Sequence, residues 1–183
     1  MLKLVDLGPE HRFTRRVDAY APVDIEIVSA AGLSIDEIFY WRSAGPNYLI
    51  EVKIVAASGL VGGVSLVLVP PASTRIVETV GMHAALDVQR GLPIVELEPW
   101  NARIGNREIG IDPALRFIDE EMPFIFTIAH DGIAVLAQLG EPASMVSNGD
   151  LSFLFTKQSE LCGLSLTGLS EAELELLRAS FAQ

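Results

Sequence analysis

The strongest constraint on the fold of this chain is the segment from Pro123 to Pro142, which reads PFIFTIAHDGIAVLAQLGEP. Two apolar runs, Phe124–Ala129 and Ile133–Leu139, flank His130-Asp131-Gly132. Asp-Gly between such runs is typical of a tight β-hairpin, because the turn needs a positive φ that glycine adopts without steric cost. Both runs are apolar at nearly every position, as in strands that are covered on both faces. We therefore expect this hairpin near the centre of a sheet.

A second apolar stretch runs from Ile54 to Thr74 without a charged residue, which is long enough for a membrane-spanning helix. The residues that lead into it, from Tyr48, alternate apolar and charged side chains as a half-buried strand does. Ser58-Gly59 and Gly62-Gly63 indicate a turn in its middle, and two prolines end it. We predict a buried pair of strands here and no membrane span.

Short strands and short helices are predicted along the rest of the chain. A capping box at Ser34–Glu37 predicts a helix at Ile35–Arg42, and a second one at Ser170–Glu173 predicts a helix after Ser170. Asp112-Pro113 predicts a helix at Pro113–Glu121. Gly81–Arg90 is compatible with a further helix. Alternation predicts strands at Arg12–Asp18, Val23–Val28, Tyr48–Ala57, Val64–Val69, Arg75–Val80, Ile94–Glu98, Leu151–Thr156 and Leu164–Leu166. Trp100–Gly110 and Glu141–Asp150 are expected to be loops.

These elements do not alternate regularly between strand and helix, so the predicted fold class is α+β. We expect a single domain, 1–183, built on a mainly antiparallel β-sheet of about nine short strands with three or four short helices, one of them C-terminal.

Composition limits the possible partners. Hydrophobic residues make up 50% of the chain and aromatic ones only 7%, so the apolar mass is aliphatic. Such a surplus predicts an apolar surface shared with a second copy, and hence a homo-oligomer. The formal net charge of −11 repels nucleic acid and anionic membranes, and we expect neither as a partner. The single cysteine excludes an internal disulfide, and no secretory leader is visible, so a cytoplasmic location is expected.

Histidine and carboxylate residues supply the candidates for catalysis. The three histidines are not spaced as metal ligands, and we expect neither a metal nor a cofactor. His130 lies beside Asp131 and could act as a general acid or base, and His83 and Asp112 are the other candidates for a histidine–carboxylate pair.

Aromatic residues supply the candidates for partner binding. Tyr40, Trp41 and Arg42 are consecutive, and Trp100 stands in a separate segment. Tyrosine, tryptophan and arginine are the residues that most often anchor protein interfaces. We therefore predict a partner-binding surface made of these four residues.

The leading hypothesis for function is a non-catalytic binding or assembly module that acts as a homo-oligomer and contacts a protein partner. No local catalytic motif is present, which favours this hypothesis over an enzyme. Two alternatives are a small hydrolase-like enzyme that uses a histidine–carboxylate pair, and a carrier in which the aliphatic surplus lines a cavity for a small apolar ligand.

Overall fold

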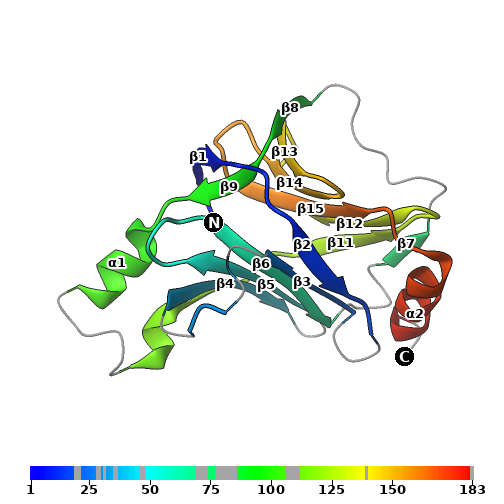
Figure 1. Ribbon diagram of the computed structural model, residues 1–183, viewed down its shortest axis with the longest axis horizontal. Coiled ribbons are helices and arrows are strands. Elements are labelled where there is room, and N and C mark those ends of the chain that lie inside the picture. The colour runs from blue at the N-terminus through cyan, green and yellow to red at the C-terminus, as the bar shows by residue number, and fades with distance from the viewer. Residues whose placement is uncertain are drawn as a thin grey trace.

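Two layers of β-sheet make up most of the molecule in the computed structural model (Figure 1). The structure describes residues 1–18, 22–27, 30, 32–34, 37–45, 48–68, 74–76, 86–105, 112–138 and 140–181. Within these ranges the chain forms fifteen strands, two α-helices and one short 3-10 helix. The fold is therefore mostly β, with fewer helices and more strands than predicted.

One layer is a six-stranded sheet with strand order β10-β4-β5-β6-β3-β2. Its strands are β2 (Phe13–Arg16), β3 (Val23–Ile27), β4 (Ile38–Gly45), β5 (Tyr48–Val55), β6 (Val61–Leu68) and β10 (Phe117–Glu120). The long apolar stretch thus forms the predicted strand pair, β5 and β6, which are antiparallel neighbours. Gly62 and Gly63 lie within β6 rather than in the turn. Among the described residues, no helix has the length and apolar character needed to cross a membrane.

The other layer is a seven-stranded sheet with strand order β7-β11-β12-β15-β14-β13-β8. Its strands are β7 (Thr74–Ile76), β8 (Asp87–Arg90), β11 (Phe124–Ile128), β12 (Gly132–Ala137), β13 (Ser144–Asn148), β14 (Leu151–Phe155) and β15 (Leu161–Thr167). A two-stranded ribbon of β1 (Leu4–Gly8) and β9 (Leu92–Val95) accompanies the two layers. Antiparallel pairs predominate, as predicted, but β10–β4, β11–β7 and β13–β8 are parallel, so the two large sheets are mixed.

The predicted hairpin is confirmed as β11 and β12, and β12 lies inside the sheet between β11 and β15. Its turn differs from the prediction. The Ala129 N–H donates to the Gly132 carbonyl, so His130 and Asp131 are the central residues, and Gly132 does not adopt a positive φ. A Cβ at position 132 would lie 2.2 Å from the carbonyl oxygen of Leu166 on β15. Glycine is therefore required here by the close approach of two strands.

The helix predicted at Ile35–Arg42 is wrong, because Ile38–Gly45 forms strand β4. The capping-box contacts do form, since the Ser34 N–H and hydroxyl both donate to Glu37 Oε2 at 2.9 Å. The residues that follow are β-branched and aromatic, and they gain two strand neighbours, β5 and β10. Pairing on both sides outweighs the local helix signal.

Four other segments also differ from the prediction. Pro113–Glu121 forms a 3-10 helix at Pro113–Arg116 followed by strand β10. Helix α1 (Glu98–Ile104) begins at the last residue of the predicted strand Ile94–Glu98 and continues into the loop predicted at Trp100–Gly110. Strand β13 lies in the predicted loop Glu141–Asp150. In the segment Gly81–Arg90, which was compatible with a helix, the last four residues form strand β8, and residues 81–85 lie outside the described residues. Residues 77–80 of the predicted strand Arg75–Val80 also lie outside them. The C-terminal helix is confirmed as α2 (Glu171–Phe181), which opens on its predicted capping box.

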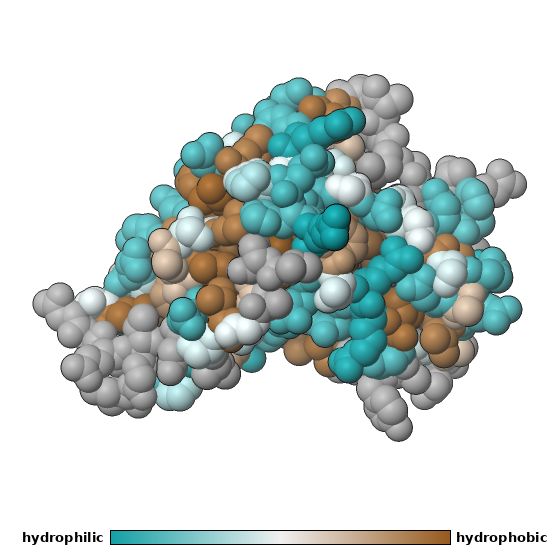
Figure 2. All heavy atoms as spheres, viewed as in Figure 1, coloured by the Kyte–Doolittle hydropathy of each residue, from teal (hydrophilic) through white to brown (hydrophobic). Residues whose placement is uncertain are grey.

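A single hydrophobic cluster joins the inner faces of the two large sheets. Ile25 and Val64 of one sheet and Val135 and Leu164 of the other line the same interior region. Among the described residues, the large hydrophobic side chains that are exposed are Met1, Val5, Val88 and Leu176. Figure 2 shows hydrophilic residues over much of one face, with hydrophobic groups between them. The aliphatic surplus is therefore largely internal, which removes the composition-based reason for a shared apolar surface.

Candidate functional site

The predicted catalytic residues lie on different parts of the fold. His130 stands in the β11–β12 turn, its side chain is 66% exposed, and its Nδ1 lies 4.0 Å from Oδ1 of the adjacent Asp131. Asp112 belongs to the segment before β10 in the other sheet, where its carboxylate accepts the Ala114 N–H at 3.0 Å and caps the 3-10 helix. His83 lies outside the described residues. The arrangement described does not assemble a histidine–carboxylate pair from separate segments.

Metal and thiol chemistry receive no support from the described residues either. No group of three or more His, Cys, Asp or Glu side chains in the described part of the chain is placed to hold a metal ion. Cys162 is buried in β15, and burial raises the pKa of its thiol to about 11. A thiol with such a pKa is protonated near neutral pH and is a poor nucleophile.

The two tryptophans predicted to bind a partner are core residues. Trp41 and Trp100 are each 1% exposed. Trp41 points inward because the side chains of β4 alternate between the two faces of the sheet. Trp100 stacks on Phe39 at 5.5 Å between ring centroids and donates its indole N–H to the Arg116 carbonyl at 2.9 Å. The predicted partner surface therefore retains only Tyr40 and Arg42.

Tyr40 and Arg42 lie on the outer face of β4, where strand β10 adds two further side chains. The Tyr40 ring stacks on Phe117 at 4.9 Å, and the Arg42 guanidinium lies 4.2 Å from the centroid of the same ring. Arg42 also donates two hydrogen bonds to Asp119, at 2.6 and 2.9 Å. We call these four residues, Tyr40, Arg42, Phe117 and Asp119, the β4–β10 surface.

Sequence reasoning missed Phe117 and Asp119 because it assigned their segment to a helix. The parallel register of β10 on β4 places Phe117 beside Tyr40 and Asp119 beside Arg42, although the two members of the second pair are 77 positions apart. Phe117–Glu120 reads as two apolar residues followed by two acidic ones, so the segment has no apolar–polar alternation that could have indicated a strand.

In the ion pair of the β4–β10 surface, each partner shifts the pKa of the other. Hydrogen bonds from Arg42 hold the pKa of Asp119 below its usual value, and the hydrogen bond to Asp119 raises the pKa of Arg42. The Asp119 side chain is 60% exposed, so solvent screens the pair. Its main effect is geometric, because a bidentate contact holds the guanidinium over the ring of Phe117.

A row of polar side chains continues from this surface across the six-stranded sheet. The strand registers place Glu51, Ser65, Asp24 and Arg16 next to one another in line with Arg42. The Ser65 hydroxyl donates to Asp24 at 2.6 Å, and Lys53 lies 3.5 Å from the same carboxylate. Burial raises the pKa of Glu51, although Lys53 and Arg42 oppose the increase. The outer face thus carries charges of both signs.

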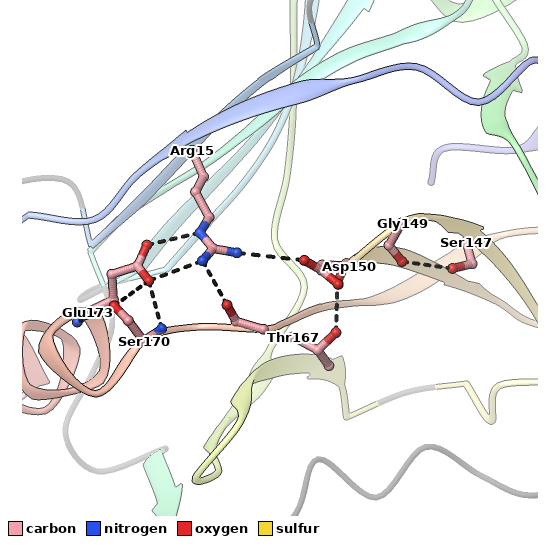
Figure 3. Close-up of polar contacts among 8 residues, drawn as sticks. Arg15, Ser147, Gly149, Asp150, Thr167, Ser170 and Glu173 are labelled. Carbon is pink, nitrogen blue, oxygen red and sulfur yellow. Dashed lines mark hydrogen bonds and ion pairs between the residues drawn. The ribbon is translucent and has the colours of Figure 1, made fainter.

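A second polar cluster joins the two sheets to helix α2 (Figure 3). Arg15 of β2 contacts Glu173 of α2 through Nε at 2.9 Å and Nη2 at 3.1 Å, and Nη2 also donates to the Gly168 carbonyl at 2.7 Å. The Ser170 N–H and hydroxyl donate to Glu173 as well. Burial acts to raise the pKa of Glu173, but the hydrogen bonds from Arg15 and Ser170 outweigh it and lower this pKa to about 2. Every group in the cluster has a partner within it, so it serves the fold.

A cleft of about 660 Å³ opens beside the β14–β15 turn. It is lined by Gly140–Ala143 and Thr156–Gln158 together with Met1, Leu86 and Glu160. The Thr156 hydroxyl oxygen already accepts hydrogen bonds from the N–H groups of Gln158 and Glu160 within the turn. None of the predicted site residues that the structure describes lines this cleft. The apolar region between the sheets holds a space of only about 20 Å³, far below the volume of a ligand-binding cavity.

A comparison with models of known protein families finds no match to this sequence, and a comparison with curated proteins finds none either.

Proposed function

We propose that this chain is a non-catalytic binding module and that it binds a second copy of itself through the β4–β10 surface and the adjoining outer face of the six-stranded sheet. One observation carries the proposal. The fold places an aromatic pair and an arginine on an outer sheet face that has charges of both signs, in a chain whose net charge is −11.

The residue types and their rigidity favour a contact surface. Tyrosine and arginine are enriched among residues that dominate binding energy, and side chains already fixed in place lose less entropy when they bind. Arg42 is fixed from two directions, by Asp119 and by the ring of Phe117. Tyr40 is fixed by stacking on the same ring.

The distribution of charge favours a second copy as the partner. Two acidic chains repel each other over most of their surfaces, because each carries eleven more acidic than basic residues. The outer face of the six-stranded sheet is nearly balanced, since its charged residues are Arg16, Arg42, Lys53, Asp24, Glu26, Glu51 and Asp119. In a two-fold symmetric dimer the same face of each copy forms the interface, so a face with charges of both signs can pair positive residues of one copy with negative residues of the other.

The test is the molar mass in solution, measured by light scattering across a dilution series. We expect a dimer whose dissociation constant rises at least tenfold in Tyr40→Ala and in Arg42→Ala, as truncation of an interface anchor implies. Val88→Ala is the matched control, because Val88 is exposed on β8 in the other sheet and should leave the constant unchanged. A monomer at all concentrations, or a dimer that neither variant weakens, would contradict the proposal.

The described residues offer no observation in favour of the two alternative functions, since His130 lies in an exposed turn beside Asp131 and the interior space is too small for a ligand. The expectations of a cytoplasmic location, of no nucleic-acid partner and of no cofactor stay predictions.

A further inference from the structure

A small cavity of about 40 Å³ lies on the core side of β4 and β10, beneath the β4–β10 surface. Its walls include Trp41 of β4, Ile118 and Glu120 of β10 and Trp100 of α1, with the N-terminal residues Met1–Lys3 at one side. It is therefore enclosed by elements from four separate parts of the chain.

Two buried polar atoms in this wall have no hydrogen-bond partner among the described residues. They are Nε1 of Trp41, whose side chain is almost fully buried, and Oε2 of Glu120. The other carboxylate oxygen of Glu120 accepts a hydrogen bond from the Met1 amine at 2.5 Å. Buried polar groups in folded proteins are nearly always paired, with protein or with ordered water. The two residues that carry this unsatisfied donor and this unsatisfied acceptor both line the same cavity.

We propose that this cavity binds one ordered water molecule, which accepts a hydrogen bond from Trp41 Nε1 and donates one to Glu120 Oε2. A water molecule occupies about 30 Å³ in the liquid, so the cavity accommodates one. A cation would face an indole N–H that can only donate, and an anion would face the carboxylates of Glu96 and Glu120, which also line the cavity. Water alone among these offers both a donor and an acceptor.

The bound water links β10 to β4 through side chains, in addition to the backbone pairing of the two strands. It would therefore help to hold the edge strand in register from the core side, while the Arg42–Asp119 pair does so from the outer side. This inference does not depend on the proposed self-association.

The chain offers an internal control, because it contains two tryptophans and therefore gives two indole N–H signals. Both side chains are buried to the same extent, but the Trp100 N–H donates to the Arg116 carbonyl. In the folded, ¹⁵N-labelled protein, assigned with Trp100→Phe, we expect a stronger nuclear Overhauser cross-peak to water from the Trp41 indole proton than from that of Trp100, which also lines the cavity but donates to Arg116. The absence of a Trp41 cross-peak, or equal cross-peaks from both, would overturn the proposal.

Three variants identify the source of the cross-peak. Glu120→Gln keeps the shape of the side chain and one acceptor oxygen, and the Trp41–water cross-peak should remain. Glu120→Leu removes the acceptor and fills the cavity, and the cross-peak should disappear. Lys3→Met removes a nearby ammonium group whose protons exchange with solvent, and it should leave the cross-peak unchanged. A signal that disappears in Lys3→Met would come from that group and would count against a bound water.

Discussion

Replacing Glu173 with glutamine should destabilise the fold by an amount that depends on pH. Glutamine keeps a side-chain acceptor for the capping box at Ser170 but loses the charge that binds Arg15. The Arg15 guanidinium then keeps its hydrogen bond to the Gly168 carbonyl but loses the carboxylate that neutralises its charge. Helix α2 also contributes Leu174 and Leu177 to the core, so weaker anchoring of its first turn affects the packing of both sheets.

The size of the effect follows from the pKa of Glu173, which falls from 4.5 to about 2 on folding. One pKa unit corresponds to about 1.4 kcal/mol, which gives an upper limit of about 3 kcal/mol. The side chains of Arg15 and Glu173 are 23% and 24% exposed, and screening by solvent lowers the expected value to about 2 kcal/mol. Because the pKa is lowered in the folded state, this contribution is complete above pH 4.5 and is lost as the pH falls toward 2.

Urea unfolding of the wild type and Glu173→Gln, followed from pH 7 downward, measures this directly. The difference in the free energy of unfolding should be about 2 kcal/mol at pH 7 and should shrink below pH 4.5. Glu175→Gln is the matched control, since Glu175 is exposed on the same helix, and it should change stability by less than about 0.5 kcal/mol. A difference at pH 7 no larger than that of the control, or one that stays constant through the acid range, would refute the reasoning.

Three further predictions rest on burial and close approach. Trp41→Ala should lower the free energy of unfolding in urea by about 3–5 kcal/mol, as for other core aromatic residues. Tyr40→Ala should lower it much less. A loss for Trp41→Ala as small as the loss for Tyr40→Ala would place Trp41 outside the core. Gly132→Ala should lower the melting temperature, because the new Cβ would collide with the Leu166 carbonyl at 2.2 Å, and an unchanged Tm would show that the strands separate freely. Cys162, with a pKa of about 11, should react with a maleimide at pH 8 only after unfolding in urea, and prompt labelling of the native protein would contradict its burial.

The elements that could be predicted from the sequence are those whose signals are short in range. The β11–β12 hairpin has its two strands and its turn in one continuous segment, and β5 and β6 are likewise consecutive. The capping box of α2 lies next to the apolar residues that the helix buries. In each case the residues that form the element and the signal that predicts it lie in one short segment.

Strand β10 could not be recognised because its partner β4 is distant in the sequence, whereas β4 was missed because a local helix signal precedes it, although its other partner β5 follows it directly. A capping box precedes Ile38 and an Asp-Pro pair precedes β10, and both patterns are local helix signals. For β10, membership of the sheet is decided by pairing with a segment 77 positions away, which no local pattern contains. The same error affected the site. Once residues 38–45 form a strand, alternation turns Trp41 inward and leaves Tyr40 and Arg42 outside. There they lie beside Phe117 and Asp119, which no local pattern connects with them.

The contact between Arg15 and Glu173 has a consequence for how fast the chain folds. It joins positions 158 apart, so it forms only when β2 and α2 are both in place. Closing so large a loop early is entropically costly, and topologies dominated by distant pairings fold on a timescale of roughly milliseconds to seconds. During that interval the apolar faces of both sheets lack the leucines of α2 and are exposed to other chains. Docking of α2 should therefore mark the point at which a folding molecule ceases to be prone to aggregation.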